Sequence, residues 1–367
     1  MGLKLSNRQR TALHCLAGAL AFALFAVLLL CFPTLAGQGV KSGLTVCAAV
    51  VIPALFPFTA AAVFLQKSGV LYWLSRRRCK ALKLLLGLNA QEGGILLLSL
   101  LGGYPIGARL LGQAYQNRQL ERRQALRLLA FCVNAGPTFY LAVLGKGLFG
   151  NLKTGLCLLG CNALSVLCLS ALSRFIAPKN FAQAPKLPPL PPLTDSFVES
   201  VTDAALTMLS LSAWVVLFSC FGSILKGLLP GGIYQSAALA ALEVTGGCLT
   251  LGSLGCSPAV LAFFTAFGGL SVLFQVKYSA GTLRPPLWYL IFSSLLRGAL
   301  SAAFTRAALS LFPTAAPCLA LQGGLNPVLQ VDYRCLFLIL FLAVFLLFTL
   351  KPAEKLPKFV KKNQRNT

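Results

Sequence analysis

The most constraining feature of this sequence is a series of long apolar stretches separated by short clusters of basic residues. Several of these stretches reach or approach the roughly 20 residues that a helix needs to cross a bilayer. Hydrophobic residues make up 57% of the 367 positions, and charged residues only 11%. The pattern predicts an all-α polytopic protein of the cell membrane, in contact with the lipid bilayer.

The basic residues give the chain a formal charge of +24. Because they lie in short clusters between apolar runs, as topology signals do, we expect no nucleic-acid partner. The stretch MGLKLSNRQR at 1–10 and the segment 351–367 are both basic. The sequence therefore predicts a multi-pass protein with both termini in the cytoplasm.

Residue types that carry catalytic chemistry are scarce. The 13 cysteines are scattered through the sequence without a CxxC pair, and His14 is the single histidine. No carboxylate stands near His14, which argues against a zinc site and against a Ser-His-Asp hydrolase. We expect no catalytic residue, no metal and no cofactor, so the protein is not expected to be an enzyme.

The segment 93–117 is an apolar run interrupted by Gly102-Gly103-Tyr104-Pro105. Basic clusters flank it on both sides, at 76–83 and 118–127, and a full crossing would move one of them outside. Two half-helices of about ten residues each would reach only about the bilayer midplane. The segment is therefore predicted to be a re-entrant helical hairpin, which enters and leaves on one side.

Charges and breaks together predict about eight transmembrane helices and two re-entrant hairpins. The second hairpin covers 233–253, and its weakly charged flanks suit the outer side. Asp195, Glu199 and Asp203 form a polar stripe on a predicted interfacial helix, and we assign them no chemistry. The predicted spans, the first of them uncleaved, are about 12–31, 42–66, 122–149, 154–176, 207–229, 258–276, 286–312 and 335–350.

A proline-rich segment, PKNFAQAPKLPPLPPL at 178–193, divides the chain near its middle. Such a segment is expected to be extended and exposed. It could be a plain cytoplasmic linker or a site for an SH3-like partner. The predicted parts are an N-terminal membrane repeat at 1–177 with hairpin 93–117, the linker, a C-terminal membrane repeat at 194–350 with hairpin 233–253, and a basic cytoplasmic tail at 351–367.

The two halves resemble each other. LLAFCVNAGPTFYLAVL at 128–144 aligns with VLAFFTAFGGLSVLFQV at 260–276, so that Gly136 matches Gly268. Each stretch follows a hairpin candidate that is broken by a pair of glycines. Since the two hairpins are predicted to enter from opposite faces, the order predicts an inverted repeat, with solute sites at the repeat interface.

The tip of the first hairpin is the first candidate binding site, with Gly103, Tyr104 and Pro105 at the break. A half-helix that begins at Pro105 would leave free N–H groups and a positive dipole end for an anion. Arg109 lies about one turn further, and its guanidinium suits a carboxylate. Alternatively, Arg109 extends toward the cytoplasm, or pairs with Glu121 or Glu243 to brace the fold.

The other candidates for solute binding come from the remaining breaks and from buried charges. The predicted break in 122–149, at Asn134-Ala135-Gly136-Pro137, could line a cavity or be a plain kink. Its counterpart in the second half starts at Gly268-Gly269, where Ser271 and Gln275, four residues apart, could instead bond between helices. Glu243 could carry a coupling proton or cation, balance Arg109, or bond the Gly246-Gly247 backbone. Arg297 could bind solute charge or pair with Glu243. The candidates are Asn134, Gly136, Thr138, Glu243, Thr245, Gly268, Ser271, Gln275 and Arg297.

Four motifs in order, GGYPIGAR, LLAFCVNAGPTF, LEVTGG and FGGLSVLFQV, resemble the YlbJ-type sporulation integral membrane proteins of endospore-forming bacteria. These proteins are part of a wider group with a nucleoside recognition or Gate domain. The resemblance implies a role in spore formation, in moving dipicolinic acid across a spore-enclosing membrane. The chain departs from the pattern at Val133 and at Leu273-Phe274, which bears on the solute rather than on the fold.

Three functions follow as hypotheses. The first is a transporter of a small anionic solute that works by alternating access at two hairpin tips, with dipicolinic acid as the implied solute. The second is a transporter of a nucleoside or a related solute, which would not need Arg109 and Arg297. The third is a membrane scaffold for spore envelope assembly that transports nothing. A homo-oligomer is compatible with each.

Overall fold

The computed structural model describes residues 7–69, 84–176 and 192–311, and every regular element within them is helical. The predicted span 335–350, the basic tail and nearly all of the proline-rich linker lie outside these ranges. The helices are α1 (Asn7–Cys31), α2 (Pro33–Val46), α3 (Ile52–Lys67), α6 (Ala90–Gly102), α7 (Tyr104–Gln116), α8 (Arg122–Leu129), α9 (Leu152–Ser173), α10 (Leu193–Leu228), α11 (Ile233–Leu242), α12 (Val244–Ser253), α13 (Pro258–Phe267), α14 (Gly269–Ser279) and α15 (Leu287–Leu311). Two π-helical segments, Cys47–Val51 and Phe139–Leu148, complete the core elements.

Five helical stretches in the described part of the chain are long and apolar enough to cross a membrane. They support the prediction of an all-α, multi-pass membrane protein. Shorter apolar helices of 10 to 17 residues lie among them, at Cys15–Cys31, Gln91–Gly102, Phe139–Leu148 and Ile233–Leu242. The five long stretches are Pro33–Lys67, Leu152–Ile176, Leu193–Leu228, Pro258–Ser279 and Leu287–Leu311.

Three predicted spans differ from the helices that the structure contains. The predicted span 258–276 is interrupted at Gly268, between α13 and α14. The predicted span 122–149 is two helical segments, because α8 ends at Leu129 and the next helical segment starts at Phe139. The predicted break at Asn134 to Pro137 is confirmed. The predicted interfacial helix before span 207–229 is wrong as a separate element, because α10 runs without interruption for 36 residues.

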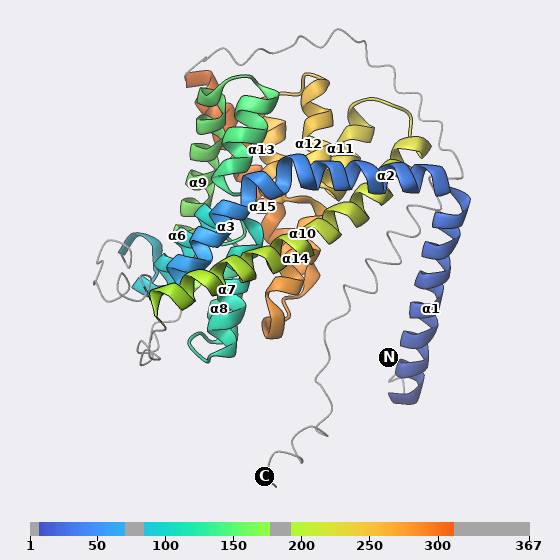
Figure 1. Ribbon diagram of the computed structural model, residues 1–367. Coiled ribbons are helices and arrows are strands. Elements are labelled where there is room, and N and C mark those ends of the chain that lie inside the picture. The colour runs from blue at the N-terminus through green and yellow to red at the C-terminus, as the bar shows by residue number, and fades with distance from the viewer. Residues whose placement is uncertain (1–6, 70–83, 177–191, 312–367) are drawn as a thin grey trace, which may run out of the picture.

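The longest helices form a pair across one face of the molecule. The continuous stretch α2–α3 and helix α10 lie side by side and run in opposite directions (Figure 1). Glycines bring the two backbones into contact, since a Cβ atom on Gly39 would lie 2.6 Å from the Cα of Cys220. Small residues at such crossings let membrane helices pack closely.

The same order of elements occurs in both halves. A long helix is followed by two short helices, then by an interrupted helix, and then by a single helix that crosses the bundle. In the first half these are α3, α6–α7, α8 with the segment Phe139–Leu148, and α9. In the second half they are α10, α11–α12, α13–α14 and α15.

Gly107 of α7 provides a test of this packing. A Cβ atom there would lie 1.8 Å from the carbonyl oxygen of Cys132, a backbone atom that cannot rotate away. We therefore expect Gly107→Ala to lower the free energy of unfolding by about 3 kcal/mol, the range of severe overpacking. Equilibrium unfolding in mixed detergent–SDS micelles would measure it.

Gly160 of α9 is the matched control, because a Cβ atom there would meet nothing within 4 Å. Gly160→Ala should leave stability unchanged or raise it, since alanine is the better helix former. Equal stability of the two variants would contradict the close approach of α7 to the break at residues 130–138.

Candidate functional site

Four helix breaks meet in the interior of the molecule. Gly103 (φ 84°) separates α6 from α7, and Gly268 (φ 87°) separates α13 from α14. A Cβ atom on Gly103 would lie 3.3 Å from the amide nitrogen of Gly136, and one on Gly268 would lie 3.3 Å from the Tyr104 ring. Gly269 approaches α11 in the same way, at 3.0 Å from the Ala240 carbonyl oxygen. The breaks therefore lie against one another, as hairpin tips and interrupted helices would at a shared site.

Tyr104 connects the first hairpin candidate to the second half of the chain. Its buried hydroxyl donates a hydrogen bond to the carbonyl oxygen of Thr265, in the last turn of α13. That carbonyl lies close to the break at Gly268. The bond therefore couples the position of the break at Gly103 to that of the break at Gly268.

Arg297, from the middle of α15, joins two further helix ends and is fully buried. Its Nε and Nη2 atoms donate to the Ala266 carbonyl oxygen at 3.1 and 2.9 Å, and its Nη1 atom donates to the Ala130 carbonyl oxygen at 3.0 Å. Nη2 also donates to Ser294 Oγ at 3.1 Å. The carbonyls at a helix end lack intrahelical partners, and a cation there is stabilised by the helix dipole.

These contacts correct one prediction. Arg297 does not pair with Glu243, because the guanidinium binds backbone carbonyls from both halves. Glu243 instead caps α12, where its carboxylate accepts from the amides of Thr245 and Gly246 at 2.8 and 2.7 Å. The predicted bonding of Glu243 to the glycine backbone is confirmed at Gly246, while the Gly247 amide binds the Glu243 carbonyl oxygen.

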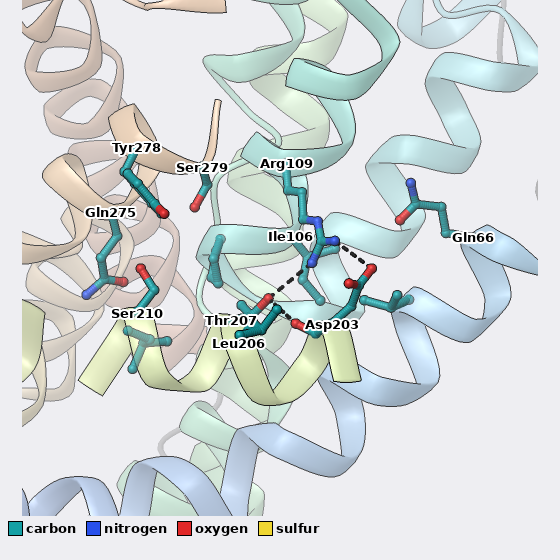
Figure 2. Close-up of a pocket in the computed structure, with 13 residues that line it drawn as sticks. Gln66, Ile106, Arg109, Asp203, Leu206, Thr207, Ser210, Gln275, Tyr278 and Ser279 are labelled. Carbon is teal, nitrogen blue, oxygen red and sulfur yellow. Dashed lines mark hydrogen bonds and ion pairs between the residues drawn. The ribbon is translucent and has the colours of Figure 1, made fainter. Parts of the chain in front are cut away.

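A cavity of about 420 Å³ lies beside these breaks, between α3, α7, α10 and α14 (Figure 2). Of the residues proposed from sequence, Pro105, Arg109 and Gln275 line it. The full lining is Val63, Gln66, Pro105, Ile106, Arg109, Asp203, Leu206, Thr207, Ser210, Leu211, Gln275, Tyr278 and Ser279.

Arg109 has a partner that the sequence analysis missed. Its Nη2 atom lies 2.6 Å from Asp203 Oδ2, and its Nη1 atom donates to Thr207 Oγ1 at 3.2 Å. Figure 2 shows all three side chains on the cavity wall. The predicted alternatives, pairing with Glu121 or with Glu243, are therefore wrong. The stripe to which we assigned no chemistry supplies the carboxylate.

Asp203 belongs to a chain of alternating charges. Its Oδ2 atom also lies 3.1 Å from Lys67 Nζ, and Lys67 lies 2.5 Å from Glu199 Oε2. The spacing of the acidic stripe was visible in the sequence, but its cationic partners come from α3 and α7. Only the tertiary packing brings these four residues together.

The remaining candidates lie around the breaks and on α14. Gln275 donates to Ser271 Oγ at 3.2 Å, so the predicted common face of this pair is confirmed. Asn134 donates from Nδ2 to the Phe131 carbonyl oxygen at 2.7 Å, which braces the break. Among the described residues, Asn134 Oδ1 and Thr138 Oγ1 are buried polar atoms without a hydrogen-bond partner.

A buried ion pair braces the entrance to α6. Glu92 Oε1 lies 3.2 Å from Arg127 Nη2, and both side chains are almost fully buried. Glu92 also closes a capping box with Asn89, through bonds of 2.8 and 2.9 Å. The sequence contained the capping-box pattern N-x-x-E at 89–92, which is typical of the start of a helix.

Comparison with known proteins identifies a related membrane protein. The chain is 23% identical over 214 residues to the sporulation integral membrane protein YlbJ of Bacillus subtilis (strain 168), a match that covers 53% of this chain and 52% of the relative. The chain is a distant homologue of a sporulation membrane protein. The match to an integral membrane protein agrees with the apolar helices in supporting a multi-pass membrane protein, and it spans about half the length of that relative. No protein-family description matches the chain, and no solved structure does.

Arg297→Lys tests whether Arg297 holds the ends of α8 and α13 together. Lysine replaces the three guanidinium nitrogens that bind the Ala266 and Ala130 carbonyl oxygens with one ammonium group on a shorter side chain, and a buried carbonyl without a partner costs about 1–3 kcal/mol. We expect a loss of about 2 kcal/mol in unfolding free energy, measured in mixed micelles. Arg306→Lys, at an exposed position of the same helix, should change nothing. A loss of similar size in both variants would point to a general need for arginine in α15.

Proposed function

We propose that the protein is an integral membrane transporter of a small anionic solute, with dipicolinic acid as the first solute to test. The observation that carries this proposal is the cavity in which Arg109 lies next to the Gly103 break and binds a carboxylate. The distant relationship to a sporulation membrane protein favours a spore-enclosing membrane as its location.

The lengths of the short helices favour two re-entrant hairpins. Helices α6 and α7 have 13 residues each, and α11 and α12 have 10 each. At about 1.5 Å per residue each spans roughly 15–20 Å, about half the thickness of a bilayer. Non-helical backbone at that depth is tolerated where protein buries it or where it lines a cavity. The repeated order of elements favours alternating access between the two halves.

The geometry around Arg109 favours an anion as the solute. Its guanidinium already holds a carboxylate oxygen at 2.6 Å, so it is oriented for one. A solute carboxylate could exchange with Asp203, which would keep Lys67 as its partner at 3.1 Å. The exchange would therefore keep Asp203 paired, which avoids the cost of an isolated, partly buried charge. Glu243 is the residue that we propose for a coupling proton or cation.

One observation favours a neutral solute, such as a nucleoside, as the second candidate. The two charged residues that line the cavity, Arg109 and Asp203, balance each other, as Lys67 and Glu199 do beside it, so no net charge awaits the solute. Uptake of labelled dipicolinate and of a labelled nucleoside into proteoliposomes distinguishes the two. Uptake of neither would favour the scaffold hypothesis.

Arg109→Ala should lower kcat/KM for dipicolinate uptake by at least about tenfold, because a charge-assisted hydrogen bond contributes about 1.5–3 kcal/mol. Arg123→Ala, at an exposed position on α8, is the matched control and should transport normally. Undiminished uptake by Arg109→Ala would eliminate Arg109 as the anion site.

Asp203→Asn is the opposing variant, because it removes the internal competitor for Arg109. We expect its KM for dipicolinate to fall by about three- to fivefold, the worth of a partly exposed ion pair of up to about 1 kcal/mol. Concentration-dependent uptake measures it. A higher KM would mean that Asp203 helps to hold the solute rather than competing with it.

A further inference from the structure

We infer that the protein has a second solute vestibule, on the opposite face of the membrane from the Arg109 cavity, and that a stack of Trp214, Phe218 and Phe274 closes the route between them. The inference rests on the proposed transport function and deepens it by naming the barrier. Three observations support the inference: the two cavities, the order along α10 of the residues that line them, and the stacking of the Trp214, Phe218 and Phe274 rings.

The second cavity has a volume of about 460 Å³ and lies between α2, α10, α11 and α12. It contains the charged groups of Lys226 and Glu243 among hydroxyl and amide side chains, so it suits a small polar or anionic solute. Its polar lining residues are Gln38, Ser42, Ser219, Ser223, Lys226, Glu243 and Thr250.

The two cavities lie in sequence along α10. Residues between Asp203 and Leu211 line the first, and residues between Phe218 and Gly227 line the second. Leu211, Trp214 and Phe218 follow at three- and four-residue spacing, so they share one face of the helix. Asp203 and Lys226 are separated by about 35 Å along the axis, close to the roughly 30 Å of a hydrocarbon core. The facing edges of the two cavities, Leu211 and Phe218, are only about 10 Å apart along the axis. The cavities lie toward the two ends of a helix that is long and apolar enough to cross a membrane, and a crossing helix directs its ends to opposite membrane faces.

Aromatic rings occupy the stretch between the cavities. The Phe274 ring is stacked on Trp214, with centroids 5.8 Å apart and planes at 12°, and on Phe218 at 6.0 Å and 27°. Phe221 adds an edge contact to Phe218 at 6.0 Å. Such contacts are favourable beyond the area they bury, so the stack is a stable closure.

The stack borders the second cavity and lies next to residues that line the first. Phe218 itself lines the second, and Gln275, the residue after Phe274, lines the first. Phe274 stands on α14, which begins at the Gly268 break. A shift of the Gly268 break against its neighbouring breaks would therefore move Phe274 relative to α10. Opening the barrier requires this motion.

Side-specific labelling tests the inference without any solute. Ser210→Cys reports on the first cavity and Ser223→Cys on the second, both being half-buried in the native chain. Right-side-out and inside-out membrane vesicles are treated with a membrane-impermeant methanethiosulfonate. Peptide mass spectrometry then separates these cysteines from native ones such as Cys220. We expect each engineered cysteine to react at least about tenfold faster from one side, and the two to prefer opposite sides.

Trp214→Ala should remove this side preference for both cysteines, whereas Trp214→Phe should keep it. Phe274→Ala replaces Trp214→Ala if that variant does not reach the membrane. Reaction of both cysteines from the same side, or an unchanged preference after the alanine substitution, overturns the inference. Opposite preferences in a protein that transports neither dipicolinate nor nucleoside would reject the proposed function and retain the two vestibules.

Discussion

The guanidinium of Arg297 is the contact on which the arrangement of the two halves depends. Interrupting a helix inside a membrane exposes carbonyl groups where water cannot reach them, and each needs a partner. α15 supplies that partner for the ends of α8 and α13 with one side chain that binds Ala130 and Ala266. Since α8 is in the first half and α13 in the second, a single residue fixes two breaks relative to each other.

This use of Arg297 leaves Arg109 as the arginine that lines the cavity. Both residues were candidates for solute charge in the sequence, Arg109 first and Arg297 second, because both stand within apolar segments. The structure distinguishes them by their surroundings. Arg297 is fully buried on backbone carbonyls, whereas the Arg109 side chain remains 26% exposed and binds a carboxylate that a solute could replace.

The sequence was most informative where glycine and proline interrupt a helix. The breaks at Gly103, at Asn134 to Pro137 and at Gly268 were all predicted, because these residues act through local backbone geometry. The order of elements followed from the same signals. Local rules misplaced one interruption, since the second hairpin breaks at Glu243 and the predicted pair Gly246-Gly247 lies inside α12, where the Glu243 carboxylate caps the helix.

Partners that come from distant segments could not be predicted in this way. Asp203 was placed on an interfacial helix because the acidic stripe to which it belongs suggests the membrane surface. In the structure α10 continues through this stripe, and Asp203 lies against Arg109 and Lys67. The bond from Arg297 to Ala130 spans 167 positions, and nothing in either local sequence marks it. Such contacts depend on how the helices pack, which the spacing of residues along one helix does not determine.

Hydrogen exchange at the two breaks tests the central role of Arg297 most directly. Amide exchange, measured by mass spectrometry in detergent micelles, reports local opening of the backbone. Comparing wild type with Arg297→Lys, we predict that residues 128–138 and 264–270 lose protection together while α10 stays protected. Loss of protection at one break only, or at neither, would contradict the claim that this side chain holds both halves at their interruptions.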